Sequence, residues 1–317
     1  MDILQDFYFS FCVNDAYVPY ICVTIKSIIE NHRGIRKTVY VLSNQVSERN
    51  RHLLEEVVAE DQDTCLEIVI VDDTPLRGLK ETWPIYAWYR LLIPNYLPEN
   101  VHKILYLDAD TVVCGDLTSL FNIDMSDFSV AGCIDPESFN PETIIRCGFD
   151  MVKDKYICSG VLLMNLDFWR SCQLSQKMIA YAREFNERIK FPDQDTINIL
   201  CKDTKVVLPL KYGIMDYFFE QEFLCNESYR EQLLECVVQP AVVHYAGRNP
   251  WKRELATTVF QDEWDKYNRM LKHPAKKEYI TKGWLWVRMM IWNALHPNRN
   301  HNRMTREQIL KKLEETS

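Results

Sequence analysis

The first seventy residues alternate between β-prone runs and helix-period stretches, and this alternation restricts the fold more than any other feature of the chain. Residues 7–13 are an aromatic β-prone run, residues 19–30 carry isoleucines at helical spacing, and residues 39–42 are a second apolar run. A predicted helix over 48–58 and a predicted strand over 66–71 complete the pattern. Because a helix between two strands returns the chain to the same end of a sheet, such strands pair in parallel. We therefore predict an α/β fold in which helices cover a sheet.

Polar and acidic residues follow several of these strands directly. They are Asn14-Asp15, Asp72-Asp73 and Asp108-Ala109-Asp110. The strands predicted further along the chain are 104–107, 128–132 and 161–165. In open α/β sheets, ligands bind beyond the carboxyl ends of the strands. The sequence therefore predicts a ligand site at this edge of the sheet.

Asp108 and Asp110 are the strongest candidates for metal binding. Two carboxylates one residue apart can turn towards a single divalent cation, and Mg²⁺ and Mn²⁺ prefer such oxygen ligands. The spacing Asp-x-Asp occurs at 61–63, 108–110 and 193–195, but only 108–110 directly follows an apolar strand. His244, after the apolar run 241–243, is a candidate third ligand that favours Mn²⁺.

From the local sequence pattern alone, each of these residues could also have a purely structural role. Aspartates in a turn often cap helices, and this reading also fits Asp193 and Asp195 at the start of a predicted helix. A single histidine at a strand end is usually structural. Arg90, which lies among aromatic residues, is typical of a packed, snorkelling side chain.

Composition excludes several classes of protein. The 45 acidic residues outnumber the 37 basic ones, for a net charge of −8, so we expect no binding to nucleic acid. The chain has no run of eighteen uncharged apolar residues, which argues against a membrane span, and its acidic N-terminus argues against a signal peptide. The 11 cysteines form no C-x-x-C pair and are expected to be reduced. We therefore expect a cytoplasmic protein.

Charge divides the chain at residue 250. Residues 251–317 contain 14 Lys/Arg and 8 Asp/Glu, a net of +6, whereas residues 1–250 have a net charge of −14. This shift predicts a main domain over 1–250 and a basic, aromatic helical extension over 251–317.

Taken together, the motifs resemble those of glycosyltransferase family 8, the retaining sugar transferases with a GT-A fold that use UDP-sugars. The resemblance spans about residues 7–252 and rests on seven motifs in the family's order. They are residues 11–18 (FCVNDAYV), 89–91 (YRL), 105–110 (LYLDAD), 159–166 (SGVLLMNL), 193–195 (DQD), 244–247 (HYAG) and 250–251 (PW).

The resemblance implies both a fold and an activity. The fold is a Rossmann-like mixed sheet flanked by helices, with a C-terminal helical extension. The activity is metal-dependent transfer of galactose or glucose from a UDP-sugar to a glycan or glycolipid acceptor of the bacterial envelope.

The resemblance also implies which residues hold the metal and the diphosphate. Asp108, Asp110 and His244 would hold Mn²⁺, with Mg²⁺ as the alternative, against the diphosphate of UDP. Ala109, between the two carboxylates, would also lie against the nucleotide. Gly247 would let the backbone approach the diphosphate closely.

The remaining implied roles concern uridine and the donor sugar. Three residues of the first motif would line the uridine pocket: Val13, Asn14 and Tyr17. Arg90 and Asp193 would contact the donor sugar, with Gln194 nearest its anomeric carbon. Because an amide is a weak nucleophile, Gln194 favours front-face transfer, in which the departing phosphate oxygen takes the acceptor's proton, over double displacement.

Two positions depart from the family's pattern. Cys158 stands where the family commonly has Asn, and a thiol is a poor hydrogen-bond donor, so a sugar contact there is lost or altered. Asn249 stands where a Lys commonly precedes the closing Pro-Trp, which leaves Arg248 or Lys252 to supply the cation for the diphosphate.

Three other functions remain alternatives. A haloacid-dehalogenase-type phosphatase would use Asp108 as its nucleophile, but its downstream acidic motif is missing, since Gly115-Asp116 is followed four residues later by Leu120. A sugar nucleotidyltransferase would need a Gly-rich basic loop, and the chain has only 9 glycines. A protein that binds a UDP-sugar without transferring it would fit the two departures.

The segment 270–312 predicts a peripheral contact with an anionic membrane. It contains ten Lys/Arg and only two acidic residues. Residues 283–295 include three tryptophans, and tryptophans flanked by basic residues are typical of a helix that lies in the membrane interface. This places the enzyme on the inner face of the plasma membrane. The alternative is that the apolar face formed by Trp284, Val287, Ile291 and Leu295 packs on the main domain or in a homodimer.

Overall fold

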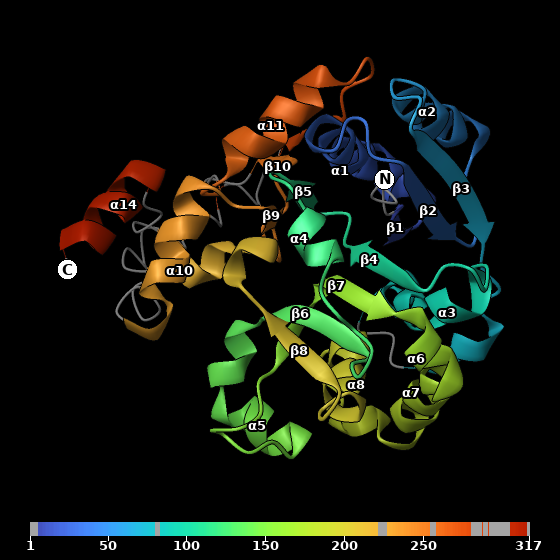
Figure 1. Ribbon diagram of the computed structural model, residues 1–317, viewed down its shortest axis with the longest axis vertical. Helices are drawn as coiled ribbons and strands as arrows, with labels where there is room; N and C mark the ends of the chain where they lie inside the picture. Colours follow the sequence, from blue (N-terminus) through green and yellow to red (C-terminus); the bar gives the residue numbers. More distant parts are fainter. Residues whose placement is uncertain are drawn as a thin grey trace.

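The structure is a computed structural model, and it describes residues 6–79, 83–220, 227–253, 258–279, 287, 291 and 305–315. A twisted sheet runs through the middle of the molecule, with helices on both sides (Figure 1). The fold is therefore the mixed α/β type that the sequence predicts.

The central sheet has seven strands in the order β3-β2-β1-β4-β7-β6-β8. The strands are β1 (Phe7–Cys12), β2 (Lys37–Ser43), β3 (Thr64–Ile70), β4 (Lys103–Leu107), β6 (Val130–Ile134), β7 (Ile157–Asn165) and β8 (Lys205–Leu208). β1 to β4 pair in parallel, whereas β7 runs antiparallel to both of its neighbours, β4 and β6. Because β7 runs the opposite way, its first residues lie beyond the carboxyl end of β4.

Alternate residues of the inner strands face two separate hydrophobic clusters. In β4, Leu105 and Leu107 join the cluster that contains helices α1 and α2, whereas Ile104 and Tyr106 join the cluster on the opposite face. This alternation follows from the two-residue period of a strand, and it explains why the strands are apolar on both faces.

The helices are short, apart from α1, α2, α7 and α10. The α-helices are α1 (Val18–Asn31), α2 (Glu48–Val58), α3 (Ile93–Tyr96), α4 (Thr118–Phe121), α5 (Pro141–Cys147), α6 (Leu166–Ser171), α7 (Leu174–Glu184), α8 (Pro192–Leu200), α10 (Glu227–Val238), α11 (Gln261–Met270) and α14 (Arg306–Glu315). The 3-10 helices are η1 (Asp15–Tyr17), η2 (Thr74–Leu76), η3 (Ile85–Leu92), η4 (Pro136–Phe139), η5 (Asn186–Arg188), η6 (Leu210–Tyr212) and η7 (Asp216–Phe219).

Two small sheets lie beside the central one. β5 (Thr111–Val113) pairs antiparallel with β9 (Val242–His244), and β10 (Lys252–Arg253) pairs with β11 (Glu278–Tyr279). The first pairing joins segments that are about 130 residues apart in the chain. It brings His244 opposite Thr111, the residue that follows Asp110.

The predicted element bounds differ from the observed ones where short segments join the sheet. The strand predicted at 161–165 begins at Ile157, and the strand predicted at 128–132 runs over Val130–Ile134. The sequence analysis missed β5 and β8, because strands of three or four residues are too short to show periodicity. Asp193 and Asp195 lie inside the first turns of α8 and not before it.

The segment after residue 250 packs against the main body where the structure describes it. Trp251, Trp264 and Tyr267 are buried in the same cluster as α1, and Ile309 and Leu313 of α14 are buried there too. Most of the predicted membrane segment, residues 280–286, 288–290 and 292–304, lies outside the described residues. No helix in the described ranges is long and apolar enough to cross a bilayer.

Candidate functional site

The strand pairing places three candidate metal ligands together. Asp108 and Asp110 follow β4, and the turn between them leads into β5. Because β5 pairs with β9, His244 lies beside this turn, and the N–H of Tyr245 donates to the carbonyl of Asp110 at 2.8 Å. The buried ring of His244 therefore faces both carboxylates.

The three side chains form a compact group of mixed ligands. Nε2 of His244 lies 3.7 Å from Oδ2 of Asp108 and 3.4 Å from Oδ1 of Asp110, and one ligand atom from each residue fits within 4.8 Å. Two carboxylate oxygens and one imidazole nitrogen are a set that Mn²⁺ accepts well and that Mg²⁺ also tolerates. The residues present therefore fit a divalent cation.

Gly160 of β7 leaves the space that this group occupies. A Cβ atom at residue 160 would lie 2.1 Å from Cε1 of His244 and 2.8 Å from Oδ2 of Asp108. Its carbonyl also accepts from the N–H of Asp108 at 2.8 Å. A side chain at this position is thus incompatible with the observed placement of both ligands.

Cys158 lies on the other side of the imidazole. Its Sγ is 3.5 Å from Nδ1 of His244, so Nε2 is the nitrogen that points to the carboxylates. Burial would lower the pKa of His244, but Cys158 and Asp110 together raise it well above its usual value. The thiol of Cys158 therefore helps to orient this candidate ligand, because a group bonded to the far nitrogen of an imidazole fixes its ring.

Arg90 joins the metal group to the rest of the site. Its guanidinium donates to Oδ1 of Asp108 at 2.9 Å and to the carbonyl of Ser159, and its Nε lies 3.1 Å from Oδ2 of Asp193. Arg90 is 5% exposed and its guanidinium lies 4.4 Å from the centre of the Tyr106 ring. The snorkelling interpretation of Arg90 is wrong, because its charged end is paired inside the protein.

Gln194 is held by both of its amide atoms. Its Oε1 accepts from the N–H of Ser159 at 2.8 Å and from the Ser159 hydroxyl at 3.2 Å, and its Nε2 donates to Asp135 at 3.3 Å. Burial raises the pKa of Asp135 from 3.8 to about 6, and burial likewise raises the pKa of Asp193, against the attraction of Arg90. The sugar-side candidates are thus partly desolvated polar groups in fixed positions.

All of these residues line one cavity of about 480 Å³. Five carboxylates face it: Asp108, Asp110, Asp135, Glu137 and Asp193. Arg90 is the only Lys or Arg among its lining residues in the described part of the chain, and it is already paired with two of those carboxylates. A larger surface hollow of about 670 Å³ contains none of these side chains. Carboxylates therefore outnumber the basic side chains of the lining, which are Arg90 and His244.

The predicted uridine-binding residues lie at the end of β1 and outside this lining. Asn14 accepts from the N–H of Tyr17 at 3.2 Å and so caps η1. The Tyr17 ring lies 5.7 Å from Tyr86 and 6.0 Å from Trp251, centre to centre. Val13 is buried in the core. Their role towards uridine stays a prediction.

The residues predicted to meet the diphosphate are separated in space. Gly247 lines the cavity with a positive φ of 68°, whereas Ala109 is absent from the lining and packs against the core. Arg248 pairs with Asp216 and with Glu220, at 3.6 and 2.8 Å respectively.

Lys252 lies in β10 with an exposed side chain. For Lys252 and Arg248 the role towards the diphosphate stays a prediction.

The sequence analysis missed Asp135 and Glu137, which also line the cavity. Asp135 directly follows β6, so the rule that picked Asp108 would have found it. The predicted strand ended at 132, two residues before the observed end at Ile134, so Asp135 was not recognised as a strand-end residue. The repeat at 61–63 does not line the cavity, and Asp61 forms a buried ion pair of 2.7 Å with Lys37.

The chain is similar to a family of sugar transferases over most of its length. The model of Glycosyl transferase family 8 matches residues 9–255. Lipopolysaccharide 1,2-glucosyltransferase of Escherichia coli is 27% identical over 257 residues, which are 79% of this chain and 75% of that protein. Lipopolysaccharide 1,3-galactosyltransferase of Salmonella typhimurium is 25% identical over 215 residues, covering 65% of this chain and 61% of that protein.

A solved structure gives the same result for the fold. The galactosyltransferase LgtC, in complex with donor and acceptor sugar analogues, is similar with a TM-score of 0.73 and 26% identity. The match covers 84% of this chain and 96% of that one. It confirms the GT-A-type α/β fold that the sequence resemblance implied.

Replacing Gly160 with alanine tests the geometry of the metal group. We expect Gly160→Ala to weaken Mn²⁺ binding by roughly tenfold or more, because the new methyl group displaces the His244 ring. The change is measured by electron paramagnetic resonance of free Mn²⁺, with circular dichroism to monitor the fold. Gly115→Ala is the matched control, since its Cβ would meet its nearest atoms at 3.4 Å. Unchanged Mn²⁺ affinity in Gly160→Ala would refute this placement of the ligands.

Replacing Asp135 with asparagine tests its raised pKa. Between pH 3.8 and about 6 the folded protein keeps a proton on Asp135 that the unfolded chain has lost, so raising the pH through this window costs stability. Asp135→Asn removes this loss. Its melting temperature relative to wild type should therefore rise from pH 4 to 6 and stay level above that, as measured by thermal denaturation. A difference that does not change with pH would show that Asp135 titrates normally.

Proposed function

Because the chain belongs to glycosyltransferase family 8, we propose that it is a retaining enzyme that moves glucose or galactose from a UDP-sugar to an acceptor. The observation that carries the proposal is that the Asp108, Asp110 and His244 group faces Asp193 and Gln194 across one cavity. A site with a cation-binding half and a sugar-binding half matches the two ends of a sugar diphosphate.

Charge supports a requirement for a metal ion. A diphosphate group is anionic, and the cavity presents five carboxylates against two basic side chains, Arg90 and His244, which are both paired with these carboxylates. The diphosphate can therefore enter only with a cation, which we propose is Mn²⁺, with Mg²⁺ as the alternative. When bound, the ion supplies Lewis-acid neutralisation of the charge on the leaving diphosphate.

The chain's own residues position the donor around this point. Arg90 holds Asp108 in place from behind and fixes Asp193 on the sugar side. We assign Arg90, Asp193 and Gln194 to the donor hexose, and Gly247 to close approach of the backbone to the diphosphate. We assign the uridine to Val13, Asn14 and Tyr17, and a supporting cation to Arg248 or Lys252.

The contacts of Gln194 favour front-face transfer. Its Oε1 already accepts two hydrogen bonds from Ser159, which makes an amide oxygen an even weaker nucleophile. Asp193 is paired with Arg90 and is likewise engaged. In the proposed step the bond from the anomeric carbon to the phosphate oxygen breaks, the acceptor oxygen bonds to the same face, and its proton goes to the departing phosphate oxygen.

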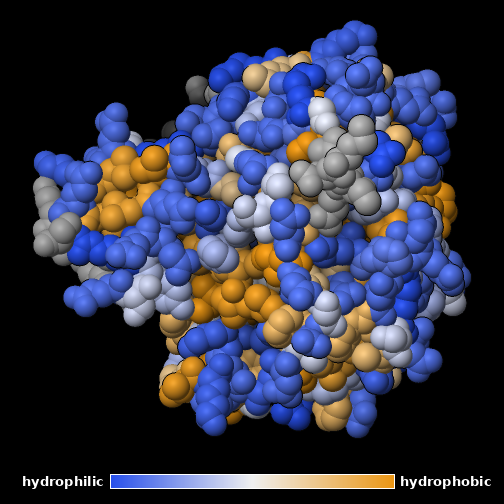
Figure 2. Space-filling view, viewed as in Figure 1, coloured by the Kyte–Doolittle hydropathy of each residue, from blue (hydrophilic) through white to orange (hydrophobic). Residues whose placement is uncertain are grey.

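The acceptor that we propose is a glycan or glycolipid of the bacterial envelope. Its support is that two similar proteins are named as lipopolysaccharide glycosyltransferases. We place the enzyme in the cytoplasm, at the inner face of the plasma membrane. In the described part of the segment 270–312, Val287 and Ile291 are helical and 44% and 52% exposed. Figure 2 shows apolar side chains gathered over α10 and α14, and a second apolar patch near the middle of the same face.

The phosphatase and nucleotidyltransferase alternatives lose their support with the family match, which covers both the Asp108 and His244 motifs. The binding-only alternative is decided by the assay below. It predicts that UDP-sugars bind but are not turned over.

UDP release from UDP-glucose and UDP-galactose tests the activity. We expect release with Mn²⁺ and none with EDTA, and Asp110→Ala should lower turnover on the order of a hundredfold or more, because it removes a ligand. Asp63→Ala is the control, since it shares the Asp-x-Asp spacing but lies before β3; Asp61 is unsuitable because it pairs with the buried Lys37. Release that continues in EDTA, or near-normal activity in Asp110→Ala, would contradict the proposal.

Liposome flotation tests the membrane contact. Truncation is a poor test, because α14 buries Ile309 and Leu313 in the core. We instead compare two sets of four substitutions to glutamine. The tail set is Lys282, Arg288, Arg299 and Arg303, and the body set is Arg49, Arg77, Lys153 and Lys177. Since a basic residue near an anionic leaflet contributes about 1 kcal/mol, the tail set should lower binding to anionic liposomes by about a hundredfold or more. Equal binding of the two variants would contradict a contact through the tail.

A further inference from the structure

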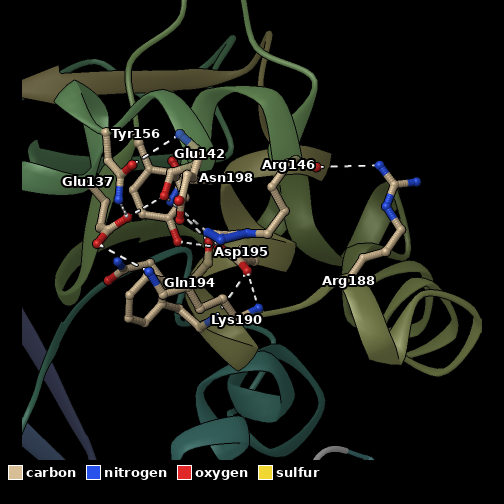
Figure 3. A network of polar contacts seen from close by, with 12 residues as sticks. Glu137, Glu142, Arg146, Tyr156, Arg188, Lys190, Gln194, Asp195 and Asn198 are labelled. Atoms are coloured by element: carbon tan, nitrogen blue, oxygen red, sulfur yellow. Dashed lines mark hydrogen bonds and ion pairs between the residues drawn. The ribbon is translucent and has the colours of Figure 1, made fainter.

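A buried carboxylate behind the cavity gathers four hydrogen-bond donors. Oδ1 of Asp195 accepts from the hydroxyl of Tyr156 at 2.6 Å and from Arg146 at 3.0 Å (Figure 3). Oδ2 accepts from the backbone N–H groups of Lys190 and Phe191, at 2.7 and 3.1 Å. Asp195 is 1% exposed and is not among the residues that line the cavity. We call these five groups the Asp195 network.

The Asp195 network holds the start of α8. Phe191 is the N-cap residue of this helix, and its side chain makes no capping hydrogen bond. The Asp195 carboxylate reaches back instead and satisfies the N–H groups of Lys190 and Phe191, and its charge also suits the positive end of the helix dipole. The next two residues, Pro192 and Asp193, and then Gln194, lie in the turn that is held in this way.

The network also ties this turn to two other segments. Tyr156 comes directly before β7, and Arg146 lies in the last turn of α5. Further along α8, the amide of Asn198 exchanges hydrogen bonds of 2.8 and 2.7 Å with the backbone of Ile157. The body of α8 is therefore fixed to β7 by Asn198, and its first turn by Asp195.

A second chain of contacts closes a ring around the turn. Arg146 lies 3.4 Å from the hydroxyl of Thr143, which donates to Glu137. The N–H of Glu137 donates to Asp135 at 2.8 Å, and Asp135 accepts from Gln194 at 3.3 Å. The ring thus connects Asp195 to its neighbour Gln194 through η4 and α5.

We propose that Asp195 is a positioning residue that sets the place of Gln194 and Asp193 in the cavity through Tyr156, Arg146 and the N–H groups of residues 190 and 191. This inference rests on the proposed function, since it assigns Gln194 and Asp193 to the donor sugar. Asp195 acts only through them, because it is separated from the cavity. A displacement of about 1 Å at a reacting centre costs as much as a hundredfold in rate, so the network controls turnover while leaving nucleotide binding intact.

The test uses variants that remove single contacts and leave the protein folded. Asp195→Ala is avoided, because it leaves Arg146 and two buried N–H groups unpaired. Tyr156→Phe removes one donor, Arg146→Met removes the charge, and Arg146→Lys restores it. Tyr267→Phe is the matched control: Tyr267 is 1% exposed and its hydroxyl is bonded at 2.9 Å to Asn31, but it lies in α11.

Five quantities are measured for each variant in the full chain: melting temperature, UDP affinity with Mn²⁺, kcat for UDP release, KM for UDP release, and hydrogen–deuterium exchange of the amides of residues 190 and 191. For Tyr156→Phe and Arg146→Met we expect a kcat lowered about tenfold and faster amide exchange. UDP affinity should be unchanged, and Arg146→Lys should recover part of kcat. For the control Tyr267→Phe we expect at most a lower melting temperature, with kcat, UDP affinity and amide exchange unchanged.

Other outcomes overturn the inference. An unchanged kcat in Tyr156→Phe and Arg146→Met would contradict it. A parallel fall of UDP affinity and kcat would also contradict it, because it would show that the network only stabilises the fold. If the wild-type protein released no UDP from either donor, the proposed function would fail by itself. Amide exchange needs no turnover, and unchanged exchange in both variants would show independently that the network does not hold this turn.

Discussion

The buried guanidinium of Arg90 is the interaction on which the rest of the site depends. It lies between Asp108, a candidate metal ligand, and Asp193, which we assign to the donor sugar, and it also donates to the carbonyl of Ser159. Without this cation, two partly buried carboxylates would face each other across the cavity, and ionising both would be costly in free energy. Burial opposes the charge of Arg90, but the two carboxylates raise its pKa further, so it stays ionised.

The N-terminal part of β7 serves both halves of the site. Gly160 leaves room for the metal ligands, Cys158 contacts the far nitrogen of His244, and Ser159 binds Gln194. Successive residues of a strand point to opposite faces, so Cys158 and Gly160 both lie against His244, whereas Ser159 between them meets Gln194. The Cys158 departure was expected to alter a sugar contact. Its thiol lies against the imidazole of His244, and Cys158 also lines the cavity, so the altered sugar contact stays a prediction.

The C-terminal segment shows how far a charge pattern can describe a structure. The change of charge at residue 250 predicts an extension, and its described helices α11 and α14 pack closely on the main body through Trp264, Tyr267, Ile309 and Leu313. Charged residues lie mostly on the surface, whereas these four packing residues are buried. The net charge of a segment therefore does not indicate how tightly the segment packs on the main body. The apolar residues of the same segment are the ones that indicate packing on the main body, because burying large aromatic side chains is strongly favourable.

The sequence by itself determined the α/β fold of the first half, since alternating strands and helices leave a parallel sheet as the arrangement that buries both. It also singled out Asp108 and Asp110 among three similar pairs, because only they follow a buried strand directly. Tertiary structure alone decided that β5 pairs with β9 and brings His244 to them, that Arg90 is paired and not snorkelling, and that Asp195 lies behind Gln194. The physical reason is that periodicity reports which face of an element is buried. The partner of each hydrogen bond depends on which distant segments become neighbours, and a pairing between strands of three residues leaves no periodic trace.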